Sequence, residues 1–134
     1  MLLYFTWLNN ILTLKKKKTL VIGASPNPYR YSNIAIHKLR NLNHETVAFG
    51  LKHGKVTDVE IDIELIDYKN IHTITLYVNP SLQKEYYNYI IGLKPKRVIF
   101  NPGTENPEFF TILKENNIDY EVACTLVLLS TNQY

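Results

Sequence analysis

The chain has 134 residues, of which 46% are hydrophobic and 20% are charged, with a net charge of +3. These values are typical of one globular domain with a core of its own. The charge is mild and partly concentrated in one run, Lys15 to Lys18, so we expect no nucleic-acid partner. The only cysteine, Cys124, excludes an intramolecular disulfide and a cysteine-rich zinc site, and it favours a cytoplasmic protein.

The first fourteen residues differ from the rest of the chain. Residues 1–14 are mostly apolar, but Asn9 and Asn10 interrupt the run, which is too short to span a membrane. A secretory signal would carry its positive charge before the apolar run, whereas here the lysines follow it. We interpret 1–14 as an extension outside the fold, with a membrane-surface anchor as the alternative, and 15–134 as the domain.

The first half of the domain begins with an almost entirely apolar strand at 19–23, expected near the centre of a sheet. Ser32 or Asn33 is expected to cap a helix that runs to about residue 43. A second strand is predicted at 45–49. Residues 51–60 are predicted to form a loop.

The second half continues the alternation of strands and helices. We predict a strand at 73–78, a helix from Pro80 to about 93 with Leu82 on its buried face, and a strand at 96–100. Asn106 can cap the next helix, with Pro107 at its first position. The remaining elements are a strand at 119–122 and a final helix at 124–130.

This order predicts an α/β, Rossmann-like, doubly wound and mostly parallel five-stranded sheet with helices on both faces. Ligands of such sheets bind at the carboxyl ends of the strands, where the strand order switches. The candidate site therefore gathers the turns that follow Gly23, Phe49, Val78 and Phe100.

The turn after the first strand favours a phosphate group. The backbone N–H groups of Gly23, Ala24 and Ser25 can surround a pyrophosphate at the start of a helix, and Pro26 stiffens the loop. Arg30 can pair with the phosphate, although a solvated arginine and a turn without a ligand remain alternatives. Because the loop lacks the G-x-G-x-x-G spacing, it does not by itself identify a dinucleotide.

The turn after the second strand narrows the ligand class. An NAD site usually places a carboxylate there to bind the ribose, but the stretch from Phe49 to His53 contains none. Lys52 suits a phosphorylated ribose instead, as in coenzyme A or NADP. A plain surface lysine is the alternative for Lys52.

No catalytic set or metal site is predicted. Cys124 has no evident activating base and is interpreted as a packed thiol. The four histidines lack metal-ligand spacing, and Glu105 is a lone carboxylate in a loop.

Several stretches together resemble a known family. They are Val21 to Pro28 with Arg30 to Asn33, Thr75 to Pro80, Pro95 to Asn106, and Ala123 to Val127. They resemble the small stand-alone coenzyme A-binding proteins, whose domain also forms the nucleotide end of the succinyl-CoA synthetase α subunit. The likeness spans roughly residues 17–134, and its most specific part is the run Asn-Pro-Gly-Thr-Glu-Asn at 101–106.

The resemblance implies a Rossmann-like fold that holds coenzyme A. By position, Gly23, Ala24, Ser25 and Pro26 resemble the phosphate loop, and Lys52 stands where a ligand contact follows the second strand. The segment Tyr77, Val78, Asn79 and Pro80 resembles the one along the adenine and pantetheine, and by the fold rule Asn101 and Gly103 face the same crevice. The synthetase takes its catalytic histidine from a second domain, which has no counterpart here.

The leading hypothesis is therefore a non-catalytic protein that binds coenzyme A or an acyl-CoA as a carrier, sensor or regulatory module. A small NADP-dependent oxidoreductase and a scaffold with an empty crevice are the alternatives. A disulfide between the ligand thiol and Cys124, and a homodimer, are further hypotheses. The expected partner is a small-molecule nucleotide, with no membrane partner.

Overall fold

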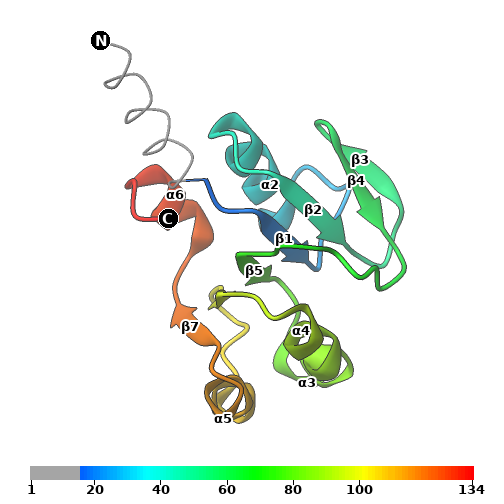
Figure 1. Cartoon of the computed structure of the whole chain (residues 1–134). Coiled ribbons are helices and arrows are strands. Elements are labelled where there is room, and N and C mark those ends of the chain that lie inside the picture. The colour runs from blue at the N-terminus through cyan, green and yellow to red at the C-terminus, as the bar shows by residue number, and fades with distance from the viewer. Residues whose placement is uncertain (1–15) are drawn as a thin grey trace, which may run out of the picture.

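The computed structural model describes residues 16–134, so the predicted extension at 1–14 lies outside the described residues. They form a seven-stranded sheet with the order β3-β4-β2-β1-β5-β6-β7 (Figure 1). The strands are β1 (Thr19–Ile22), β2 (Thr46–Phe49), β3 (Gly54–Val56), β4 (Val59–Asp62), β5 (Thr73–Leu76), β6 (Arg97–Phe100) and β7 (Asp119–Val122). The helices are α2 (Tyr31–Asn41), α3 (Pro80–Gln83), α4 (Tyr87–Leu93), α5 (Pro107–Glu115) and α6 (Thr125–Ser130), with a 3₁₀ turn at Lys84–Tyr86.

The strand β1 lies inside the sheet and pairs in parallel with β2 on one side and β5 on the other. From β1 the chain moves outward through β2 to the β3–β4 pair, and it then returns to β5 and moves outward again through β6 to β7. All of these pairings are parallel except that of β3 with β4. The switch in strand order therefore lies between β1 and β5. Ligands of doubly wound sheets bind at the carboxyl ends of the strands beside this switch, so the turns at that edge form the candidate site.

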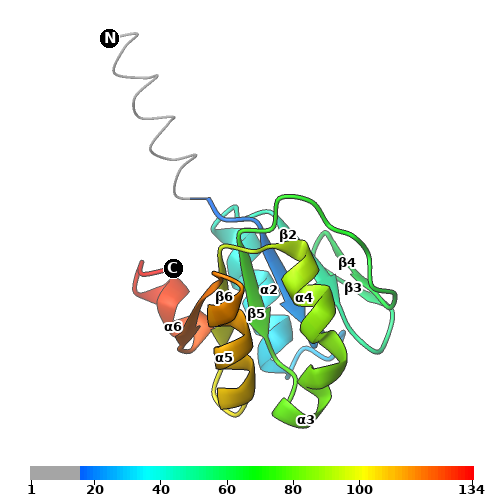
Figure 2. The ribbon, with the colours of Figure 1, turned by 60° about the horizontal axis from the view of Figure 1, so that its bottom comes forward.

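Helices cover both faces of the sheet. In Figure 2, α3, α4 and α5 lie in front of the sheet and α2 lies behind it. Side chains alternate along β1, so that Leu20 and Ile22 join the core beneath α4 and α5, while Val21 joins the core beneath α2 and α6. The predicted doubly wound α/β class is confirmed. Within residues 16–134, none of the helices has the length and apolar character needed to cross a membrane.

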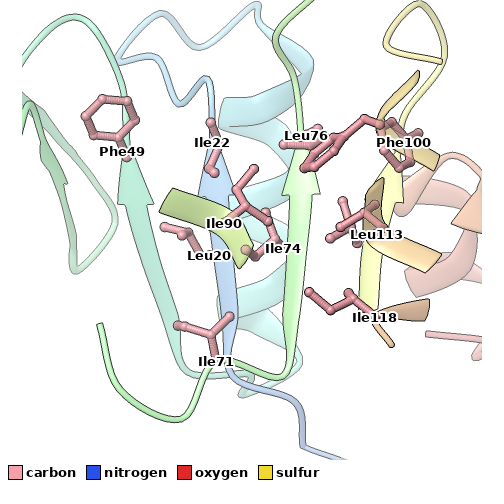
Figure 3. Packing of buried hydrophobic residues seen from close by; sticks show 12 residues of the cluster. Leu20, Ile22, Phe49, Ile71, Ile74, Leu76, Ile90, Phe100, Leu113 and Ile118 are labelled. Atoms are coloured by element: carbon pink, nitrogen blue, oxygen red, sulfur yellow. The ribbon is translucent and has the colours of Figure 1, made fainter. Parts of the chain in front are cut away.

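A row of large apolar side chains underlies the carboxyl edge of the sheet. The register aligns Phe49, Ile22, Leu76 and Phe100 across β2, β1, β5 and β6, and Figure 3 shows them at the same level on these strands. All four are buried. Because close-packed cores resist deformation, this row gives the turns above it a firm base.

The predicted number of strands was wrong, because residues 51–60 are not a simple loop. Residues 54–62 form the β3–β4 hairpin, in which Val56 pairs with Val59 around a tight turn. The turn residues are Thr57, with a φ of 54°, and Asp58. Tight hairpins usually have Asn-Gly or Asp-Gly at this place, so the usual sequence signal was missing.

Two helix predictions also need correction. The helix α2 begins at Tyr31 rather than after a cap at Ser32 or Asn33, and Arg30 at its N-cap position makes no side-chain capping bond. The predicted helix from Pro80 to 93 is divided by the 3₁₀ turn into α3 and α4. In consequence Gln83, not Leu82, is buried. The cap at Asn106 with Pro107 in the first turn is confirmed.

Candidate ligand-binding site

Four turns meet at the carboxyl edge of the sheet. The N–H groups of Gly23 and Ala24 both donate to the carbonyl oxygen of Phe49, each at 3.0 Å. The N–H of Tyr77 donates to Ile22 O at 2.9 Å, and Asn101 Nδ2 donates to Leu76 O, also at 2.9 Å. The structure therefore brings the turns after β1, β2, β5 and β6 into direct contact.

Gly23 is required by both its conformation and its surroundings. Its φ is +91°, which favours glycine, and a Cβ at this position would lie 2.9 Å from both Tyr77 C and Tyr77 O. The backbones of the first turn and of the β5 turn thus touch at the point where the strand order switches. A side chain at position 23 would force these two turns apart.

The loop after Gly23 holds its own shape. Asn27 N donates to Ser25 Oγ at 3.1 Å, and Asn27 Oδ1 accepts from Tyr29 N at 3.0 Å. Asn33 Nδ2 donates to Ser25 O at 2.9 Å, so this residue anchors the loop instead of capping the helix. The sequence does not reveal this role, because the partner is eight residues away, outside the range of capping patterns.

Backbone donors are available at the start of α2. Within residues 16–134, the N–H groups of Ser25, Tyr31 and Ser32 have no hydrogen-bond acceptor. The helices α3 and α5 differ, because the side chains of Asn79 and Asn106 cap them. The free N–H groups and the helix dipole make the start of α2 suitable for an anion.

Two cationic side chains accompany these donors. Arg30 and Lys52 are exposed, and in the part of the chain that the structure describes neither side chain has an ion pair or a hydrogen bond. The turn that carries Lys52 lies beside the loop that follows Gly23, since a Cβ on Gly54 would come within 2.8 Å of Pro26 Cβ. A negatively charged ligand above the loop would therefore find unneutralised positive charge.

The segment from Tyr77 to Pro80 borders the site mainly with its backbone. The side chain of Tyr77 packs against the core beneath α2 and α6, and burial raises the pKa of its hydroxyl to about 12. The carbonyl of Val78 accepts from Gln83 Nε2 at 2.9 Å. Asn79 is exposed, and its side chain caps α3, in which Pro80 is the first residue.

The side chain of Asn101 is fully engaged within the protein. Its Nδ2 donates to Thr75 Oγ1 at 2.7 Å as well as to Leu76 O, and its Oδ1 accepts from Thr125 N at 2.9 Å. Asn101 is only 3% exposed. It lies at the predicted edge, where its amide holds β5, β6 and the start of α6 together.

Gln83 is a structural residue of the site that sequence analysis did not identify. It is fully buried, and its Nε2 donates to Thr104 O at 2.8 Å in addition to Val78 O. Its Oε1 accepts from Asn106 Nδ2 at 3.0 Å. Gln83 thus joins the β5 turn to the β6 turn. Helical periodicity could not identify it, because a glutamine on a short helix is usually solvated.

The side chains that could take part in a reaction do not form a catalytic or metal-binding group among residues 16–134. The carboxylate of Glu105 accepts from the N–H of Gly103 at 2.6 Å, and Gly103 is exposed with a φ of +91°. Cys124 is a partly buried free thiol immediately before α6. Among residues 16–134, no three His, Cys, Asp or Glu side chains are grouped so that they could hold a metal ion.

Solved structures share this fold. A protein described as uncharacterized is 47% identical over 89% of this chain and 98% of its own, with a TM-score of 0.87. A hypothetical protein from Pyrococcus horikoshii OT3 is 28% identical over 92% of this chain and 87% of its own, with a TM-score of 0.78. A protein from Thermus thermophilus is 22% identical over 96% and 98% of the two chains, with a TM-score of 0.76, and it supports the fold alone.

The comparison with curated proteins found no significant match. The comparison with family models is more informative, because residues 17–130 match the CoA binding domain. This match includes all seven strands and all four turns of the carboxyl edge. The chain therefore belongs to the CoA-binding domain family.

Proposed function

We propose that the protein binds coenzyme A or an acyl-CoA at the carboxyl edge of its sheet, as a non-catalytic carrier, sensor or regulatory module. The observation that carries the proposal is the uncapped start of α2 together with Arg30 and Lys52, which lack anionic partners among the described residues. Membership of the CoA-binding domain family supports the same ligand class.

The residues at this edge suit the charge distribution of coenzyme A. Its pyrophosphate would lie over the turn of Gly23, Ala24, Ser25 and Pro26, where the N–H of Ser25 is available. Arg30 would share that charge. The N–H groups of Gly23 and Ala24 already donate to Phe49 O, so their role is to shape the turn.

The rest of the ligand would follow the neighbouring turns. Lys52 would pair with the 3′-phosphate of the ribose, since the end of β2 offers a cation and no carboxylate. The segment from Tyr77 to Pro80 would contact the adenine or the pantetheine arm. Asn101 would support this surface from below, and Gly103 would border its open side.

A small NADP-dependent oxidoreductase is the alternative, because NADP also carries a phosphorylated ribose. Such an enzyme would need a proton donor beside the nicotinamide. No Tyr-x-x-x-Lys pair occurs in the sequence, and Glu105 is engaged with Gly103. These observations favour binding without catalysis.

Calorimetric titration of the protein with coenzyme A, NADP and NAD tests the proposal. We expect saturable binding of coenzyme A, and Lys52→Glu should weaken it about tenfold or more, because a charge-assisted hydrogen bond is lost. Lys114→Glu is the matched control, since this exposed lysine lies near Arg97 and Asp119, at the opposite edge of the sheet.

Each other result identifies an alternative. Tight binding of NADP without coenzyme A would favour the oxidoreductase. No heat with any ligand, from protein shown to be free of bound nucleotide, would favour a scaffold. An equal loss of affinity for coenzyme A in the Lys52 and Lys114 variants would show that Lys52 is not part of the site.

A further inference from the structure

Gly50, the residue after β2, is pressed against the phosphate loop. A Cβ on Gly50 would lie 2.2 Å from Ala24 O and 3.1 Å from Ala24 C. The φ of Gly50 is not in the left-handed region, which only Gly23 and Gly103 adopt among the glycines of the described residues. Glycine is therefore needed at position 50 for space and not for backbone conformation.

The other end of the same turn makes a similar contact. A Cβ on Gly54 would meet Pro26 Cβ at 2.8 Å. The side chain of Ile61 on β4 lies next to both positions, with Cγ2 at 3.2 Å from a Cβ on Gly50 and Cδ1 at 3.9 Å from one on Gly54. Both ends of the turn at 50–54 thus contact Ile61 of the β3–β4 hairpin and the phosphate loop.

Between these contacts the turn projects into solvent. Leu51 is 86% exposed, and Lys52 and His53 are exposed as well. The N–H of Gly50 donates to Asp62 O at 3.0 Å, which fixes the start of the turn to the end of β4. The ring of His53 also makes a hydrogen bond, between its Nδ1 and Ile61 O at 3.3 Å. The turn that carries Lys52 is therefore held by these two hydrogen bonds to β4 and by the two glycine contacts with the loop.

We infer that Gly50 and Gly54 are positioning residues that hold Lys52 over the phosphate loop, so that position 50 determines how well the site distinguishes a 3′-phosphorylated ligand from an unphosphorylated one. This inference rests on the proposed function. A methyl group at position 50 must displace backbone on at least one side, because its neighbour is the main chain of Ala24. A charge-assisted hydrogen bond does not survive such a shift, since its strength falls steeply with distance and angle.

The experiment compares the dissociation constants of coenzyme A and 3′-dephospho coenzyme A. We expect the unmodified protein to prefer coenzyme A about tenfold, and Lys52→Gln to abolish most of this preference. Gly50→Ala should reduce the preference in the same way. Gly92→Ala, which adds a methyl group where no atom lies within 4 Å, should keep it.

A double variant distinguishes an effect of Gly50 on the position of Lys52 from a general disturbance of the site. If Gly50 acts through Lys52, combining Gly50→Ala with Lys52→Gln should reduce the preference no further than either change alone. Thermal unfolding of each variant shows whether it folds. If Gly50→Ala does not fold, Gly54→Ala replaces it, because its neighbour is the Pro26 ring rather than main chain.

The outcomes separate the two proposals. Failure of the unmodified protein to bind either ligand would overturn the proposed function and this inference together. A preference for coenzyme A that persists in folded Gly50→Ala and Gly54→Ala would overturn the inference alone. An additive loss in the double variant would also overturn it, because the glycine would then act independently of Lys52.

Discussion

His44 illustrates how a residue at the amino edge of the sheet, opposite the candidate site, responds to its surroundings. It is only 6% exposed, and its Nδ1 accepts from Lys17 N at 3.0 Å. The ring also packs edge-on against Tyr134, with 5.0 Å between the ring centroids. The pKa of His44 is lowered to about 4, chiefly by burial and also by the positive charges of Lys16, Lys17, Arg97 and His72. Protonation would remove the acceptor that Lys17 uses.

The lowered pKa of His44 predicts that the folded protein loses stability in acid. The folded protein binds a proton at His44 less readily than the unfolded chain, whose histidine titrates near 6.5. The contribution to stability is therefore complete above about pH 6.5 and decreases as the pH falls toward about 4. We expect His44→Gln to reduce the pH dependence of the unfolding free energy in this window, measured by urea denaturation. Some dependence should remain, because burial also lowers the pKa of His72.

His37 provides the control at the same scale. It is exposed on α2, so His37→Gln makes the same substitution at a histidine that is not buried. An identical pH profile for the unmodified protein and His44→Gln would show that His44 is not the group responsible.

At the scale of elements, α5 depends on one buried asparagine. Asn106 Oδ1 accepts from Phe109 N at 3.2 Å, while its Nδ2 donates to Tyr87 Oη at 2.7 Å and to Gln83 Oε1. The same side chain thus begins α5 and joins it to α3 and α4. The sequence predicted the cap, but the two bonds to other helices are evident only in the folded chain.

Asn106→Ala should lower the free energy of unfolding by more than the loss of an ordinary N-cap does. Loss of an N-cap costs about 1 kcal/mol, and leaving buried polar partners unsatisfied adds about 1–3 kcal/mol. We expect a decrease of about 2–4 kcal/mol in the unfolding free energy, measured by chemical denaturation. Asn116→Ala, at an exposed residue that follows α5, is the control. A loss of 1 kcal/mol or less, as expected for a simple cap, would mean that the network adds nothing.

The β3–β4 hairpin shows why some elements escaped prediction. Its strands have three and four residues, and its turn is formed by Thr57 and Asp58. The strand β4 is stabilised by parallel pairing of Ile61 with Ala48, which is thirteen residues earlier in the chain. A contact of that kind leaves no local pattern, so short strands are the least predictable elements.

At the scale of the whole molecule, β1 joins the two halves of the core. Leu20 and Ile22 belong to one cluster, Val21 belongs to the other, and all three are completely buried. Since neither cluster can lose β1 and persist, we expect unfolding in one cooperative transition. The glycine turn that follows β1 is therefore attached to a completely buried strand.

A ligand that binds this edge should stabilise the entire domain. At a concentration one hundred times its dissociation constant, coenzyme A should raise the unfolding free energy by about 2.7 kcal/mol. Differential scanning calorimetry with coenzyme A and, separately, with NAD measures the effect. An equal rise in the melting temperature with both ligands at the same concentration would contradict selective binding.

By itself the sequence determined the α/β class, the order of the main strands and helices, and the glycine turn before α2. These features depend on apolar periodicity and on turn residues, which act between neighbours along the chain. Only the tertiary structure decided that Asn33 and Gln83 brace the turns and that Gly50 lies against Ala24. Those contacts depend on how strands are ordered and aligned in the sheet, which brings together backbones far apart in sequence and leaves no trace in any single segment.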